Sequence, residues 1–150
     1  MNQKILIAID LSENSLKAVD YVGSIVACHA TADITMLNII KEPSEDTMPA
    51  AEERKAYLEK TRADTLALME AASSRLTAHG IPEGQIHLKI QICKKPISVA
   101  ELILHERKQE DYGTIVIGRR GMSKKEEFLF GSVSNRIVRE AKNCAVWVIE

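Results

Sequence analysis

Five short apolar runs, separated by segments with helical periodicity, constrain the fold of this chain more than any other feature. The first run, residues 5–9, is continuous and rich in β-branched side chains, which is typical of a strand buried on both faces of a parallel sheet. The other four runs fall at residues 33–40, 85–92, 113–117 and 144–149. We therefore expect five strands that alternate with four helices.

The segments between these runs carry the signals of helix starts and ends. Ser12 can cap a helix that follows the first strand, and a long helix is expected over residues 51–79, where Gly80 would end it. Ser98 and Glu101 have the spacing of a capping box. Regular alternation of strands and helices predicts an α/β fold, a three-layer sandwich with a parallel sheet and helices on both faces. We expect residues 1–150 to form one domain.

Composition narrows the class of protein. The net charge of −1 argues against a strongly basic nucleic-acid-binding protein. Three widely spaced cysteines, Cys28, Cys93 and Cys144, predict neither a disulfide scaffold nor a zinc site. The first apolar run is too short for a secretory signal or a membrane span, so we expect a cytoplasmic location.

A glycine-punctuated stretch after the fourth strand predicts a phosphate site. Gly118 and Gly121 follow the strand directly, and Gly131 precedes Ser132 and Ser134 at the start of the last helical pattern. Glycines allow positive φ and close approach of a ligand to the backbone, and a helix start offers free N–H groups and a favourable dipole. The stretch lacks the GxxxxGK[ST] pattern of the Walker A loop and the GxGxxG pattern of dinucleotide sites.

Asp10 ends the first strand and is the second candidate. Ligands of open parallel sheets bind outside the carboxyl ends of the strands, where the strand order reverses. If the first and fourth strands are neighbours, Asp10 faces Gly118 across one crevice, where it could accept hydrogen bonds from a base or sugar. A role as a helix cap is the simpler alternative, and the two roles are compatible.

These motifs resemble the universal stress protein family. Its nucleotide-binding members carry G-x-x-G-x9-G-[ST], which this chain matches with Gly118, Gly121, Gly131 and Ser132, followed by Val133 and Ser134. The first strand with Asp10, the run 36–39 and the closing run 145–148 are also similar to the family. Leu11 departs from it, because Gly or Asp is frequent at that position.

The resemblance implies more than the spacing does. It implies the strand order 3-2-1-4-5, and ATP, with or without Mg²⁺, with its adenine near Asp10 and the backbone of Ile39. The residues expected to hold the phosphates are Gly118, Gly121, Gly131, Ser132, Val133 and Ser134. It also implies a homodimer formed by antiparallel pairing of the last strand, from Cys144 to Ile149, which would cover an apolar edge.

The role of the glycine stretch remains open between three hypotheses. Arg119, with Arg120, Lys124 and Lys125, either screens a triphosphate or belongs to a solvated loop. Phosphoryl transfer needs a positioned base and a metal, and no candidate base stands out near the stretch. We therefore favour an ATP-binding regulatory dimer with a protein partner that the sequence does not name. The alternatives are a weak ATPase or phosphotransferase and a dimeric interaction protein with a vestigial site.

Overall fold

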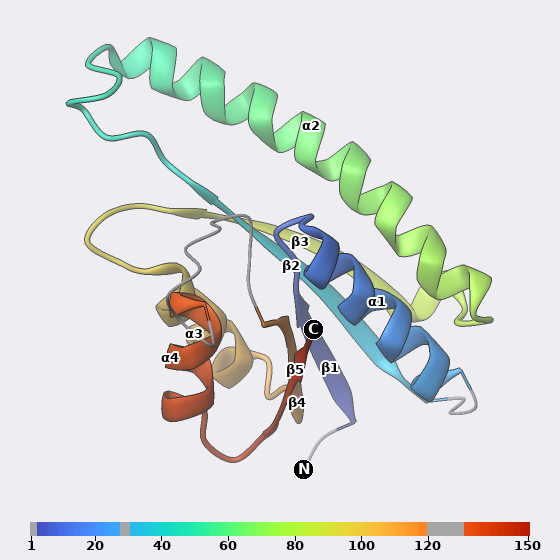
Figure 1. Cartoon of the computed structure of the whole chain (residues 1–150). Coiled ribbons are helices and arrows are strands. Elements are labelled where there is room, and N and C mark those ends of the chain that lie inside the picture. The colour runs from blue at the N-terminus through green and yellow to red at the C-terminus, as the bar shows by residue number, and fades with distance from the viewer. Residues whose placement is uncertain (1–2, 28–30, 120–130) are drawn as a thin grey trace.

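The computed structural model of the chain describes residues 3–27, 31–119 and 131–150. Strands and helices alternate along it, as Figure 1 shows. Their bounds are β1 Lys4–Ala8, α1 Glu13–Val26, β2 Asp33–Lys41, α2 Ala51–Ala78, β3 Ile86–Cys93, α3 Val99–Gln109, β4 Thr114–Gly118, α4 Ser132–Glu140 and β5 Ala145–Ile149, with a 3-10 turn at Glu83–Gln85.

All five strands run parallel in the order β3-β2-β1-β4-β5. This confirms both the fold class and the strand order expected from the sequence. The central strand β1 pairs with β2 on one side and with β4 on the other, so the chain reverses its direction of winding between them. The carboxyl ends of β1 and β4 are therefore neighbours, as the placement of Asp10 and Gly118 requires.

Helices cover both faces of the sheet and complete three layers (Figure 1). On one face α1 and α2 bury side chains such as Val19, Met69 and Leu76 against Ile7 and Met36. On the other face, α3 and α4 pack on side chains of the alternate positions of the same strands. The members of this second core are Leu6, Leu37, Ala100, Ile103, Tyr112, Ile115, Ile117 and Ile137. The aliphatic character of both cores follows from an aromatic content of only 4%.

The expected caps are present at the helix ends. The Ser12 side chain accepts the N–H of Ser15 at the start of α1, and Ser98 and Glu101 form the complete capping box of α3. Gly80 follows α2 with φ of 91°, a conformation that favours glycine. Among the helices of the described ranges, none is long and apolar enough to cross a membrane.

The edge strand β3 pairs with β2 and also contacts α3. On the α3 face, Lys89 Nζ and Gln91 Nε2 each donate a hydrogen bond of 2.6 Å to the buried Glu106 carboxylate. The pKa of Lys89 is raised, and its hydrogen bond to Glu106 is the largest cause. These contacts hold α3 over the edge strand and so position the start of α3.

Candidate functional site

The carboxyl ends of β1 and β4 lie beside the start of α1. Gly118 is the last residue of β4, and a Cβ placed on it would lie 3.1 Å from backbone and side-chain atoms of Asn14 and from the amide nitrogen of Ser15. Contacts this short are tighter than a Cβ usually makes, so a larger residue at position 118 would push the start of α1 away from β4. Positive φ, which the sequence suggested as the reason for the glycines, is not adopted by Gly118.

A tight turn carries the chain from β1 into α1. Asp10 is exposed, and its Oδ1 accepts the N–H of Ser12 at 3.0 Å, which orients the carboxylate. Leu11 has φ of 63°, in the left-handed region that a residue with a branched side chain rarely adopts. This conformation explains why glycine or aspartate would suit that position. Leu11, the residue next to Asp10, thus has a strained backbone conformation.

The end of β2 faces the same turn. The buried Asn38 side chain donates to the carbonyl of Ile9 at 2.8 Å, and the Ile9 N–H donates to the carbonyl of Leu37 at 2.9 Å. Residues two apart on a strand direct their backbone groups to the same side. Ile39, two residues after Leu37, therefore directs its amide and carbonyl towards the space beyond the end of β1. Asp10 and Ile39 border this space from neighbouring strands.

A set of short hydrogen bonds joins Arg119 to the start of α4. The Arg119 carbonyl accepts the N–H of Gly131 at 2.9 Å and the hydroxyl of Ser134 at 2.7 Å. The Ser134 side chain is buried, with 3% of the residue exposed. Ser134 is one of the residues expected to hold the phosphates, but its hydroxyl is turned inwards, because it donates to the carbonyls of Arg119 and Gly131.

Among the described residues, no side chain caps the amino end of α4. Gly131 is its N-cap residue and provides no side-chain hydrogen bond, and the first turn contains no acidic residue. In contrast, α1 and α3 each have a serine cap and a glutamate in the first turn. Gly131 has φ of −65°, so the expectation of positive φ is also wrong here. The backbone N–H groups of the first turn of α4 and its positive dipole end can therefore receive an anion.

A groove of about 420 Å³ opens beside this helix end. It lies where β2 and β3 end and α3 and α4 begin, and its lining includes Lys41, Cys93, Lys95, Ser132 and Val133. The exposed hydroxyl of Ser132 and the half-buried side chain of Val133 thus border a cavity of a size suited to a small ligand. Burial raises the pKa of the Cys93 thiol, and its Sγ donates to the carbonyl of Ile97. A buried thiol with a raised pKa is a poor nucleophile, so we assign Cys93 a structural role.

Arg136 forms the wall of the groove between the two helices. Its guanidinium donates to Ser98 Oγ at 2.8 Å, to Glu101 Oε1 at 2.8 Å and to Glu140 Oε1 at 3.0 Å. The backbone hydrogen bond from Ser98, followed by the contact with Arg136, lowers the pKa of Glu101. Arg136 therefore fixes the start of α3 relative to α4. Its positive charge is balanced by the carboxylates of Glu101 and Glu140.

The sequence of the whole chain, residues 1–150, matches the model of the universal stress protein family. The chain belongs to the universal stress protein family. No curated protein sequence matches it significantly. The family assignment confirms the resemblance that the glycine motif indicated.

Solved structures of universal stress proteins share this fold. The universal stress protein UspA from Lactobacillus plantarum has a TM-score of 0.83 at 21% identity, covering 98% of this chain and 97% of that chain. A universal stress protein in complex with cAMP has a TM-score of 0.71 at 20% identity, covering 99% and 96%. The universal stress protein from Archaeoglobus fulgidus in complex with dAMP has a TM-score of 0.59 at 16% identity, covering 98% and 97%.

The structure describes all but one of the residues expected at the site of this universal stress protein. Asp10 and Ile39 border the end of β1, Gly118 packs against α1, and Arg119, Gly131 and Ser134 are joined by hydrogen bonds. Gly121 lies outside the described residues, as do Arg120, Lys124 and Lys125.

Sequence reasoning missed the groove residues Lys41, Lys95 and Arg136. Lys41 ends β2, Lys95 follows β3 and Arg136 lies in the second turn of α4, so each reaches the carboxyl edge of the sheet. Their position at this edge could have been predicted, because it follows from the strand and helix bounds that the sequence already indicated.

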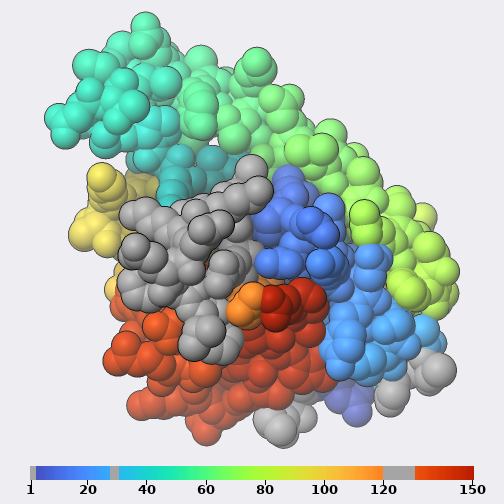
Figure 2. Space-filling model, in the orientation of Figure 1, coloured from blue at the N-terminus to red at the C-terminus, as the bar shows by residue number. Residues whose placement is uncertain are grey.

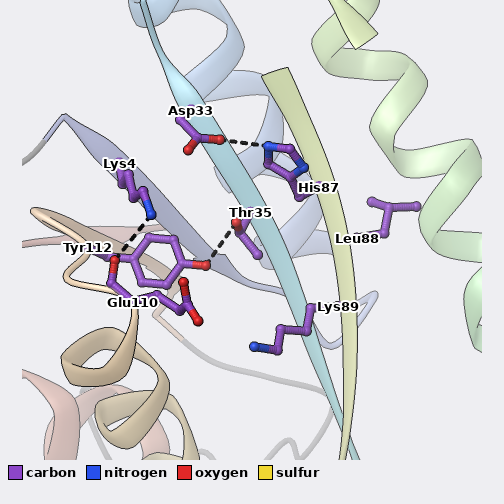
Figure 3. Close-up of a pocket in the computed structure, with 8 residues that line it drawn as sticks. All are labelled: Lys4, Asp33, Thr35, His87, Leu88, Lys89, Glu110 and Tyr112. Atoms are coloured by element: carbon purple, nitrogen blue, oxygen red, sulfur yellow. Dashed lines mark hydrogen bonds and ion pairs between the residues drawn. The ribbon is translucent and has the colours of Figure 1, made fainter. Parts of the chain in front are cut away.

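A second pocket of this universal stress protein lies at the opposite, amino edge of the sheet (Figure 3). Its volume is about 330 Å³. Polar groups that line it contact one another: the Tyr112 hydroxyl donates to Thr35 Oγ1 at 2.9 Å, Lys4 Nζ donates to the carbonyl of Glu110 at 3.4 Å, and His87 Nε2 lies 2.8 Å from Asp33 Oδ1. Burial raises the pKa of Tyr112, which stays a neutral donor. We therefore assign these groups a structural role.

Metal ligands do not gather in the part of the chain that the structure describes. No group of three histidine, cysteine, aspartate or glutamate side chains there could hold a metal ion. The uncapped start of α4 and the groove beside it identify the carboxyl edge of the sheet as the candidate functional site.

Proposed function

We propose that this universal stress protein binds ATP at the carboxyl edge of its sheet and acts as a nucleotide-dependent regulatory homodimer. The observation that carries the proposal is the uncapped, acid-free start of α4, which opens on a groove. Support from relatives is coarser: two proteins of the same fold form complexes with cAMP and dAMP, and both ligands contain adenine and phosphate.

In this proposal the phosphates bind at the start of α4. The backbone N–H groups of Ser132, Val133 and Ser134 and the exposed Ser132 hydroxyl supply the donors. The Ser134 hydroxyl holds Arg119 in place, so Ser134 contributes through its backbone. Arg119 favours negative charge nearby, and in the groove the lysines Lys41 and Lys95 outnumber the one carboxylate of the lining, Glu42.

The nucleoside would lie between the ends of β1 and β2. A carboxylate offers about four lone-pair positions, so the Asp10 group that accepts the Ser12 N–H can also accept from ribose hydroxyls. The backbone amide and carbonyl of Ile39, which face the space beyond β1, match the donor and acceptor on one edge of adenine. Gly118 lets the start of α1 pack directly against the end of β4, and so keeps the turn that carries Asp10 close to β4.

Replacing Ser132 by glutamate should weaken ATP binding by about tenfold or more, because it places a like charge in the first turn of α4. The same carboxylate suits the helix dipole, so the melting temperature should stay unchanged or rise. Equilibrium binding of ATP by calorimetry, alongside thermal unfolding, separates these effects.

Ala71→Glu is the matched control for that experiment, because Ala71 is exposed on α2 and the change adds the same charge. It should leave ATP affinity unchanged. Equal affinities in the wild-type protein and Ser132→Glu would reject the start of α4 as the phosphate site.

The proposed dimer would form by pairing of β5 with its copy. β5 is an edge strand, all of its residues are partly exposed, and Trp147 packs edge-on against the exposed Tyr21 with ring centres 6.1 Å apart. The Ala145 N–H and the Ile149 carbonyl bond towards β4. By alternation, the backbone groups of Val148 point away from β4, where a second strand can pair with them.

Val148→Pro should abolish self-association while the monomer stays folded, because proline removes an outward N–H and leaves the bonds to β4. Sedimentation measures the association, and Val148→Ala is the control, since it shortens the side chain but keeps the N–H. A dimer that persists in Val148→Pro would place the interface elsewhere.

A further inference from the structure

Arg119 connects the start of α4 to the end of β5. Its carbonyl accepts hydrogen bonds from Gly131 and Ser134, and its N–H donates to the carbonyl of Ile149 at 2.7 Å. Its guanidinium forms an ion pair with the carboxylate of Glu150. Figure 2 shows the orange end of β4 beside the dark red end of β5. The residue whose carbonyl anchors the start of α4 is thus also bound by the acidic residue that follows the edge strand.

The two side chains of this ion pair differ in how far they are exposed to solvent. The Arg119 side chain is 24% exposed and its backbone is held on both sides, whereas the Glu150 side chain is 67% exposed. An ion pair whose carboxylate is largely exposed is weak, because water and salt compete with it. Phosphate oxygens carry more charge than a carboxylate and bind guanidinium groups in the same two-pronged geometry. A phosphate close to Arg119 would therefore displace Glu150.

We propose that Glu150 is an internal competitor of the nucleotide phosphate for Arg119, an inference that rests on the proposed function. In the empty protein Glu150 holds the guanidinium; when ATP binds, Arg119 turns to the phosphate and Glu150 returns to water. Glu150 directly follows Ile149, so nucleotide binding changes the electrostatics at the end of the β5 edge. Because coupling between two sites is reciprocal, contacts that engage Glu150 at that edge favour ATP binding.

Removing the competing charge should therefore tighten binding. Glu150→Gln should raise the affinity for ATP by about two- to fivefold at low salt, and the gain should shrink as salt is added. In an Arg119→Gln background, the same change at position 150 should have no effect on affinity. Calorimetric titration of ATP into the four proteins completes the double-mutant cycle.

Glu83→Gln is the matched control, because it removes one exposed carboxylate from the turn before β3, at the opposite edge of the sheet. Equal ATP affinity in the wild-type protein and Glu150→Gln, or an equal gain in Glu83→Gln, would overturn the inference and leave the proposed function standing. Absence of ATP binding in every variant would overturn both.

Discussion

Replacing Ile137 by alanine should lower the free energy of unfolding by about 2 to 4 kcal/mol, because the change leaves a cavity in the core. Ile137 is fully buried, and it is the one apolar side chain that α4 buries completely within the described residues. The other buried residue of α4 is Ser134, which holds Arg119. The attachment of α4 to the sheet therefore depends mainly on Ile137.

Urea unfolding at neutral pH measures this effect, and Val138→Ala is the control, since Val138 is 51% exposed and adjacent on the same helix. The control should change stability by less than about 0.5 kcal/mol. Amide hydrogen exchange should show faster opening of α4 than of β1 in the Ile137 variant. A loss of stability equal to that of the control would mean that α4 is held by other contacts.

Replacing Glu106 by alanine should destabilise the protein by about 2 kcal/mol, because Lys89 and Gln91 lose their shared partner. The carboxylate is buried, with 3% of the residue exposed, but the Lys89 side chain reaches water and can be rehydrated, which limits the loss. Glu110→Ala, which removes an exposed carboxylate from the end of the same helix, should have little effect on the unfolding free energy.

The same contact predicts a pH dependence. The hydrogen bond from Lys89 to Glu106 raises the pKa of Lys89 above its ordinary value of 10.5. The folded protein therefore binds this proton more tightly, so the stabilisation is complete below pH 10.5 and is lost as the pH rises through the pKa of the folded state. Above pH 10.5 the wild-type protein should lose stability more steeply than Glu106→Ala. Parallel slopes for the two proteins would contradict the assignment.

Local patterns predicted the architecture well, because each element carries its own signals. The apolar runs and the caps at Ser12 and Ser98 depend on residues close in sequence, and the structure confirms them. The family resemblance supplied the strand order, which periodicity alone left open. The location of the dimer and the binding of ATP stay predictions.

Contacts between distant residues could not be predicted in the same way. The pairing of Glu106 with Lys89 depends on how α3 lies across β3, and the pairing of Arg119 with Glu150 depends on the register of β4 and β5. The same holds for Ser134, whose hydroxyl turns inwards only because β4 ends beside the start of α4. Residue type and spacing alone do not predict how these distant side chains lie relative to one another.

The hydrogen bond between the Gly131 N–H and the Arg119 carbonyl joins the end of β4 directly to the start of α4 across 2.9 Å. Because this contact uses backbone atoms only, it does not depend on which side chains the two residues carry. Sequence changes in residues 120–130 should therefore leave the end of β4 and the start of α4 joined, so that stretch is a place where the ligand preference of the scaffold could be altered.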